Sequence, residues 1–259
     1  MDFGISGKTA IVCGASKGLG RACAAALAEE GVKVTLVART ADAVEKAAQE
    51  ISQATGTETR AVAADVTTDE GRAAVLAACP EPDILVNNAG GPPPGDWRSF
   101  EREDWHKATD ANMLSAILLI RDVLPAMQRR KFGRIVNITS AMVKMPHEFL
   151  SLSTAARMGL TGFVSGIVPS LAKDGITINS LLPERFDTDR LTSNISKLAE
   201  RNGISIEEQR AKQQAASPTG RFGRPEEFGA TCAFLCSVPA GYISGQNILL
   251  DGGSYPGVF

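Results

Sequence analysis

The sequence predicts an α/β protein in which helices flank a doubly wound parallel sheet, and three observations carry this prediction. Short apolar runs alternate with longer amphipathic stretches along all 259 residues. The apolar runs lack the polar alternation of half-exposed strands, which is typical of parallel strands buried on both faces. A glycine-rich turn joins the first apolar run to the first helical stretch. Such strand–helix–strand units connect by right-handed crossovers and build a doubly wound sheet.

The expected strands are short runs rich in Val, Ile, Leu and Thr, which favour extended backbone. They lie at Thr9–Cys13, Lys33–Ala38, Thr59–Ala64, Asp83–Val86, Gly133–Ile138, Ile176–Leu182 and Gln246–Leu250. No internal repeat and no low-complexity linker divides them, so we expect a single domain over residues 1–259.

The expected helices carry their own start and stop signals. Gly31 is a good C-terminal stop for the first helix, and Pro225 opens the last one, where its missing N–H is tolerated. Pro169 should bend or loosen the long helix in which it lies. The helices are expected at Arg21–Glu30, Ala41–Gln53, Asp69–Ala78, two stretches within Glu101–Arg130, Thr154–Lys173 and Pro225–Cys236.

Two long segments show no regular pattern. Gly90–Ser99 contains three consecutive prolines, and the polar segment Glu184–Phe222 follows the sixth strand. Long loops of this kind are usually substrate loops or lids, so residues 184–222 are expected to be one.

Composition excludes several classes of function. With 27 Lys and Arg against 29 Asp and Glu, the net charge of −2 gives no electrostatic case for nucleic acid or an anionic membrane. The densest apolar stretch, Met113–Leu124, is interrupted by Arg121 and is too short to span a bilayer. The N-terminus enters a strand pattern without the features of a signal peptide. Five cysteines without a CxxC pair and only two histidines argue against a zinc site and favour reduced thiols in the cytoplasm.

The turn after the first strand has the composition of a dinucleotide-binding loop. Glycines let the backbone turn tightly and approach a pyrophosphate, and the following helix offers its first N–H groups. The position between the first strand and the first helix is the context that this mechanism requires. The residues are Gly14-Ala15-Ser16-Lys17-Gly18-Leu19-Gly20.

Charges near this turn favour NADP(H) over NAD(H). Lys17 lies inside the turn, and Arg39 ends the second strand, where an acidic residue would hold the ribose of NAD. Residues 37–40 contain no Asp or Glu, so two cations face the place of a 2′-phosphate. The alternative is that both are solvated surface charges. Asp65 after the third strand suits a contact to the adenine edge, or else caps the following helix.

The chain resembles the short-chain dehydrogenase/reductase family, and within it the 3-oxoacyl-ACP reductase type. The resemblance covers residues from about 5 to 253 and implies a seven-stranded Rossmann-type sheet, NADP(H) binding and commonly a homotetramer, with a dimer as the alternative. Its motifs, in order, are the turn Gly14–Gly20, Asp65-Val66, Asn87-Asn88-Ala89-Gly90, Asn112, Gly133–Ser140, Gly223-Arg224-Pro225, Ser244-Gly245-Gln246 and Asp251-Gly252-Gly253. The implied cofactor residues are Gly14, Ser16, Lys17, Gly18, Leu19, Gly20, Arg39, Asp65, Val66, Asn88, Ala89, Gly90, Pro183 and Thr188.

The catalytic motif of the family, Y-x-x-x-K, is missing. Asn112 and Ser140 match the family's Asn and Ser, but the positions thirteen and seventeen residues after Ser140 hold Ser153 and Arg157. A gapped alignment would instead place Leu150 and Thr154 there. We favour the gapless register, because the strand Ile176–Leu182 then falls at the family spacing.

Loss of the phenol and the amine changes the expected chemistry. A phenol has a reference pKa of about 10 that a nearby ammonium can lower, whereas a serine hydroxyl donates a proton poorly and an arginine stays charged. Losing one general acid costs about 10²–10⁴ in rate. Ser140 and Ser153 could still hydrogen-bond a substrate carbonyl as an oxyanion-type pair. Lys144, His147 and Glu148 are candidate proton donors on the rim, although surface roles explain them as well.

A second departure from the family follows the sixth strand. Pro183 is followed by Glu184 and Arg185, charges where the family is usually small. They form either a solvent-facing ion pair or a changed environment for the substrate.

Three functions remain open from the sequence. The first is an NADPH-dependent oxidoreductase acting on a ketone or alcohol, with a 3-oxoacyl thioester as one candidate. The second is a cofactor-binding sensor or scaffold subunit without turnover. The third is a non-redox lyase or hydrolase that uses Ser140, Ser153 and Arg157 to hold a carbonyl or a carboxylate.

Overall fold

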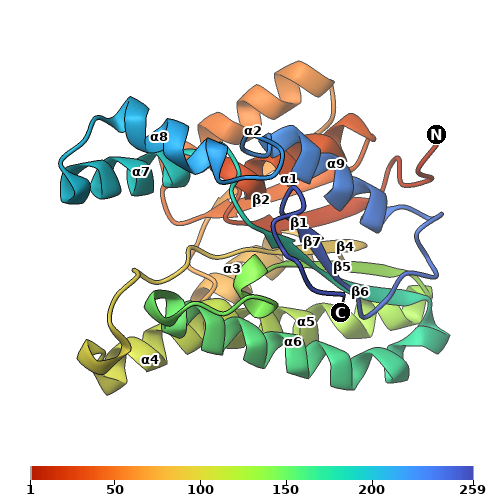
Figure 1. Cartoon of the computed structure of the whole chain (residues 1–259). Helices are drawn as coiled ribbons and strands as arrows, with labels where there is room; N and C mark the ends of the chain where they lie inside the picture. The colour runs from red at the N-terminus through yellow and green to blue at the C-terminus, as the bar shows by residue number, and fades with distance from the viewer. Residues whose placement is uncertain (1, 259) are drawn as a thin grey trace.

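Seven parallel strands form one sheet in the order β3-β2-β1-β4-β5-β6-β7 in the computed structural model, which describes residues 2–258 (Figure 1). The strand order reverses between β1 and β4, which creates a crevice-forming switch point at the carboxyl edge of the sheet. In the register, Val12 pairs with Leu36 on one side and with Val86 on the other. The strands are β1 Thr9–Cys13, β2 Lys33–Ala38, β3 Thr59–Ala63, β4 Ile84–Asn87, β5 Gly133–Ile138, β6 Ile176–Pro183 and β7 Asn247–Leu250. The predicted strands are confirmed, with ends that differ by at most one residue.

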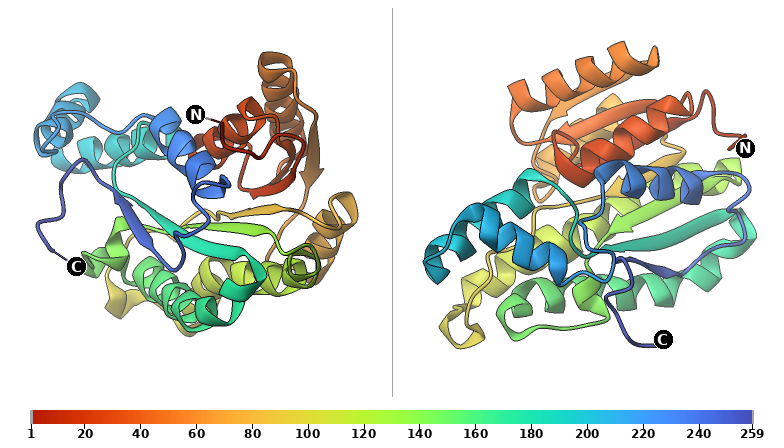
Figure 2. Two further views of the ribbon diagram at one scale, coloured as in Figure 1. Left: turned by 90° about the vertical axis from the view of Figure 1, so that its right-hand side faces the viewer. Right: turned by 45° about the horizontal axis from the view of Figure 1, so that its top comes forward.

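Helices cover both faces of this sheet (Figures 1 and 2). One face carries α1 Gly18–Glu29, α2 Ala41–Thr55 and α9 Pro225–Cys236, and the other carries α3 Asp69–Ala78, α5 Ser115–Arg130 and α6 Ser151–Leu171. Each helix buries one apolar stripe against the strands, which gives two cores. Leu27 and Phe228 belong to the first core, and Leu119 and Leu160 belong to the second.

The segment Glu184–Phe222 forms two helices, so the prediction that it lacks regular secondary structure is wrong. It contains α7 Asp189–Asn202 and α8 Ile206–Ala215, which lie beyond the carboxyl edge of the sheet (Figure 1). The Thr188 hydroxyl accepts the N–H of Leu191 at 3.4 Å and begins α7. Only Ile195 and Ala199 of α7 are buried, and such a narrow apolar stripe explains why the segment looks uniformly polar in sequence.

Helix boundaries near the expected site also differ from the predictions. The first helix begins at Gly18 rather than Arg21, and α6 begins at Ser151 rather than Thr154. Helix α6 runs through Pro169 and ends at Leu171, followed by a 3₁₀ turn at Ala172–Asp174. The end of the glycine turn, Gly18–Gly20, and Ser153 therefore lie in the first turns of helices.

A wide π-type turn at Asp110–Leu114 joins α4 Arg102–Thr109 to α5. Such turns are rare and are frequent at functional sites, and this one carries Asn112. Within residues 2–258, no helix has both the length and the apolar character needed to cross a bilayer.

Candidate active site

The glycine-rich turn folds back tightly on itself between β1 and α1. A Cβ atom at Gly20 would lie 2.3 Å from the Gly14 carbonyl oxygen, so no larger residue fits there. Gly18, Leu19 and Gly20 form the first turn of α1, whose N–H groups have no partner inside the helix. The outer side of this turn can therefore receive an anion.

Two more segments meet this turn at the carboxyl edge of the sheet. The Asn88 side chain donates to the Gly14 carbonyl oxygen at 3.3 Å. Thr188 lies over the turn, since a Cβ atom at Gly18 would be 3.7 Å from the Thr188 methyl carbon. The structure thus brings together three of the predicted cofactor segments, Gly14–Gly20, Asn88–Gly90 and Thr188, and Pro183 ends β6 at the same edge of the sheet.

The cations expected near a 2′-phosphate are available for a ligand. Lys17 and Arg39 are exposed, and neither forms an ion pair with any residue of the described chain. Asp65 does not cap α3, because Thr68 does so by accepting the N–H of Gly71 at 3.0 Å. Asp65 Oδ1 instead accepts the Thr67 N–H, and this bond, the Thr67 hydroxyl and the Arg39 charge together hold the pKa of Asp65 below its usual value.

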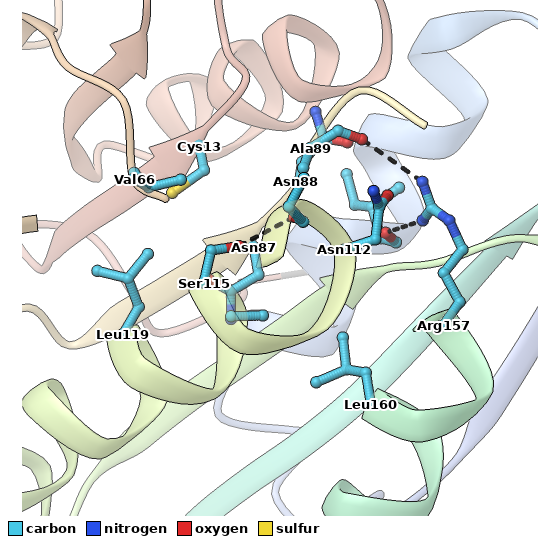
Figure 3. Close-up of a pocket in the computed structure, with 13 residues that line it drawn as sticks. Cys13, Val66, Asn87, Asn88, Ala89, Asn112, Ser115, Leu119, Arg157 and Leu160 are labelled. Atoms are coloured by element: carbon cyan, nitrogen blue, oxygen red, sulfur yellow. Dashed lines mark hydrogen bonds between the residues drawn. The ribbon is translucent and has the colours of Figure 1, made fainter. Parts of the chain in front are cut away.

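Arg157 reaches from α6 to the ends of β4 and β5 (Figure 3). Its Nη1 donates to the carbonyl oxygens of Ile138 and Thr139 at 2.8 and 2.6 Å, and its Nη2 donates to that of Ala89 at 3.4 Å. Its Nε donates to Ser153 Oγ at 3.1 Å. The residue is 7% exposed, and this burial, with the charge of Arg190, lowers the pKa of Arg157 to about 10. The guanidinium is therefore still charged at neutral pH.

Asn112 and the two serines complete this cluster. Asn112 Nδ2 donates to the carbonyl oxygens of Gly90 and Ala108, both at 3.4 Å. Ser140 Oγ accepts the N–H of Met142 at 3.2 Å, and Ser153 Oγ accepts from Arg157. Neither hydroxyl donates to another residue in the described part of the chain, so both hydroxyl protons are available to a ligand oxygen.

A cavity of about 20 Å³ lies behind this cluster, beside Cys13, Asn87, Asn112 and Arg157 (Figure 3). Val66 and Asn88 also line it. The Oδ1 atoms of Asn87 and Asn112 are buried without a partner among the described residues, which makes this small cavity polar. Burial raises the pKa of Cys13 to about 12, so its thiol stays protonated and is not a nucleophile.

Ser153 lies in the first turns of α6 and bonds to Arg157, as the gapless register expects for the positions of the family's tyrosine and lysine. Arg157, rather than Thr154, reaches the strand ends, while Thr154 Oγ1 is buried without a partner in the described chain and Leu150 precedes α6. Tyr242 is fully exposed. Tyr255 lies in the C-terminal tail with its ring centroid 6.0 Å from Lys144 Nζ.

The other rim residues make local contacts. The exposed His147 accepts the N–H of Phe149 through Nδ1 at 3.3 Å and caps a short 3₁₀ turn, and Glu148 is exposed in that turn. Glu184 pairs with Arg185 at 2.9 Å, but the Glu184 side chain is only 11% exposed, so the pair does not simply face solvent. Burial raises the pKa of Glu184.

Sequence reasoning missed two features of this site. The π-type turn has no sequence signal that we can name, and Arg190 went unnoticed although it lies two residues after Thr188. Across residues 2–258, no group of three or more His, Cys, Asp or Glu side chains is arranged to hold a metal ion.

Comparison with known proteins agrees with this geometry. The family model described as enoyl-(acyl carrier protein) reductase matches residues 14–255. The 3-oxoacyl-[acyl-carrier-protein] reductase FabG of Vibrio cholerae is 34% identical over 255 residues, which cover 97% of this chain and 98% of that protein. FabG of Escherichia coli is 35% identical over 259 residues, covering 98% and 99%. The L-sorbose reductase of Gluconobacter frateurii, solved with NADPH and L-sorbose, superimposes with a TM-score of 0.94 at 31% identity, with both chains covered completely.

The fold and the site therefore define an oxidoreductase with a Rossmann-type sheet. The chain belongs to the short-chain dehydrogenase/reductase family.

Proposed function

We propose that this chain is an NADPH-dependent reductase of ketones. One observation carries the proposal: the glycine turn Gly14–Gly20 lies at the same sheet edge as Asn112, Ser140, Ser153 and Arg157. Lys17 in this turn and Arg39 at the end of β2 form no ion pair within the described chain. The FabG relatives and the sorbose reductase, which was solved with NADPH, support the same cofactor and reaction class.

The residues present fit NADP(H). The tight backbone at Gly20 leaves room for a diphosphate on the turn, and Lys17 and Arg39 supply the charge that a 2′-phosphate requires. Asp65 and Val66 would hold the adenine, since Asp65 Oδ2 makes no bond to the described chain. Ser16 and Leu19 would contact the phosphates, and Asn88–Gly90, Pro183 and Thr188 would surround the nicotinamide end.

The chain's own residues then bind the carbonyl without a phenol. When bound, NADPH supplies the hydride for the carbonyl carbon. Ser140 and Ser153 donate hydrogen bonds to the carbonyl oxygen, and the buried charge of Arg157 stabilises the negative charge that develops there. Asn112 holds the Gly90 carbonyl and so positions the adjoining loop. The oxygen takes its proton from water, so turnover is slow.

The substrate class follows from the relatives. The FabG relatives are named for 3-oxoacyl groups on a carrier protein, so a 3-oxoacyl thioester is the first ketone to test. The relatives compared above are reductases, which favours this reading over a sensor, a scaffold, a lyase or a hydrolase.

We also propose a cytoplasmic homotetramer in which residues 184–222 act as a substrate lid. Five buried free thiols suit a reducing compartment. The exposed apolar side chains Leu114 and Met158, on the π-type turn and on α6, suit a subunit contact, which light scattering after gel filtration would test.

A titration and a turnover assay test the main proposal. NADPH and NADH are titrated by fluorescence, and NADPH oxidation is then followed with acetoacetyl-CoA and a panel of simple ketones. Tighter binding of NADPH together with ketone-dependent oxidation supports the proposal. Binding without oxidation by any ketone would assign a sensor or scaffold, and failure to bind NADPH would overturn the proposal.

A further inference from the structure

The crevice at the carboxyl edge of the sheet, between the glycine turn Gly14–Gly20, the loop after β4 and the start of α7, is called the cleft below. Arg190, in the first turn of α7, lies against the β4 loop at this cleft. Its Nη2 donates to the Gly91 carbonyl oxygen at 3.4 Å, and a Cβ atom at Gly91 would lie 2.9 Å from the same nitrogen. Gly91 directly follows the Asn88–Gly90 segment at the end of β4. Because Thr188 lies against Gly18, the start of α7 bridges the phosphate turn on one side and the β4 loop on the other.

Arg190 has no carboxylate partner. No described Asp or Glu comes within ion-pair distance of Arg190 or of Arg157. The arginines nearby in sequence are neutralised, since Arg185 pairs with Glu184 and Arg210 pairs with Asp187. The cleft therefore carries two cations without a carboxylate partner, the buried Arg157 and the exposed Arg190.

These two cations act on one another. After burial, the charge of Arg190 is the second cause that lowers the pKa of Arg157. The two positive charges repel each other, and an anion bound between or beside them would offset this repulsion. The charges at the cleft therefore favour the binding of a negative group.

Of the two cations, Arg190 has the free donors. Arg157 already donates to three carbonyl oxygens and to Ser153, and it is almost completely buried. Arg190 is exposed and makes a single bond at the outer limit of hydrogen-bond length, so its guanidinium can turn to a ligand at little cost.

We propose that Arg190 is a binding residue for an oxyanion that enters this cleft. The inference rests on the proposed function. Two sources can supply the oxyanion: the diphosphate of the dinucleotide, on the Gly18 side, or a carboxylate carried by the ketone substrate, on the Arg157 side. Either ligand would hold α7 against the β4 loop through one shared guanidinium.

The test compares Arg190→Gln with the wild type in two binding titrations that need no turnover. The first measures the Kd of NADPH. The second measures the Kd of acetoacetate and of levulinate, each beside its neutral methyl ester, on the complex with NADP⁺. Arg201→Gln, an exposed arginine at the other end of α7, is the matched control, and thermal melting checks that each variant folds.

A loss of at least about tenfold in one titration, which is about 1.4 kcal/mol, supports the proposal, since hydrogen bonds to charged groups are the strong ones. A loss for NADPH alone assigns the diphosphate. A loss for the acids alone, with the esters unchanged, assigns a substrate carboxylate. If Arg190→Gln changes both titrations by less than twofold, or no more than Arg201→Gln does, the inference is wrong while the proposed function stands. If the wild type does not bind NADPH, the proposed function fails as well.

Discussion

The two ends of the cleft differ in how far they follow the family pattern. The glycine turn Gly14–Gly20 keeps the pattern, and in the proposed function it would bind the phosphates mainly through backbone N–H groups and close glycine contacts. The proposed reaction centre, Ser140 with Ser153 and Arg157, would keep the positions of the family's side chains in the gapless register but not their acid–base chemistry. Backbone recognition depends on the fold, whereas proton transfer depends on two side chains. The same scaffold can therefore keep its ligand and change its chemistry.

The sharpest way to remove this difference is to install the family motif. The double variant Ser153→Tyr with Arg157→Lys should raise kcat for a ketone by about 10²–10⁴, because it restores a phenol that an adjacent ammonium acidifies. The NADPH affinity should change much less, since the phosphate turn is untouched. Stopped-flow and steady-state oxidation of NADPH measure both quantities.

The single variant Ser153→Tyr is the control for this gain. It supplies the phenol without the ammonium, so its kcat should lie between those of the wild type and the double variant. A double variant that folds, binds NADPH and is no faster than the wild type would show that the missing relay does not limit turnover.

A second prediction concerns the glycine turn Gly14–Gly20, the part of the cleft that keeps the family pattern. Gly20→Ala places a Cβ atom where the Gly14 carbonyl oxygen is 2.3 Å away, so the turn must open. We expect NADPH to bind about a hundredfold more weakly, which is about 2.7 kcal/mol. Gly162→Ala, in α6 with no atom within 4 Å of its new methyl group, is the matched control and should stabilise the fold by up to about 1 kcal/mol. Equal NADPH affinity in both variants would contradict the assignment of the turn.

A third prediction concerns cofactor choice. Arg39→Ala should weaken NADPH binding about tenfold, or about 1.4 kcal/mol, and leave NADH binding unchanged, because only NADPH carries a 2′-phosphate. Parallel titrations of the two nucleotides measure the ratio. A ratio equal to that of the wild type would mean that Arg39 is a solvated surface charge.

The smallest effect is expected at the rim. His147 is exposed, and its side-chain contacts within the described chain are to Phe149, two residues further on, so His147→Ala should change kcat by less than about twofold. If kcat instead falls tenfold at unchanged NADPH affinity, His147 is the missing proton donor, and the cleft has a relay from another segment.

Much of this architecture could be predicted from the sequence because its signals are local. Apolar runs fix the strands, and the glycine turn fixes the start of the dinucleotide site. The helices α7 and α8 escaped prediction because they bury few side chains, such as Ile195 and Ala199, outside the main cores. The bonds of Arg157 to Ile138 and Ala89 join residues far apart in the chain, and no local pattern reports such a contact.

The bonds of Arg157 bear on how this centre could change over evolutionary time. Its guanidinium donates hydrogen bonds to carbonyl oxygens at the ends of two strands at once. A lysine would offer a single nitrogen in place of the three nitrogens of this group. A single change of Arg157 to lysine would leave buried carbonyl acceptors without a partner, at a cost of about 1–3 kcal/mol each, before any phenol is present. We therefore expect the tyrosine and the lysine of the family motif to be acquired in this chain only together, because the single lysine change destabilises the strand ends.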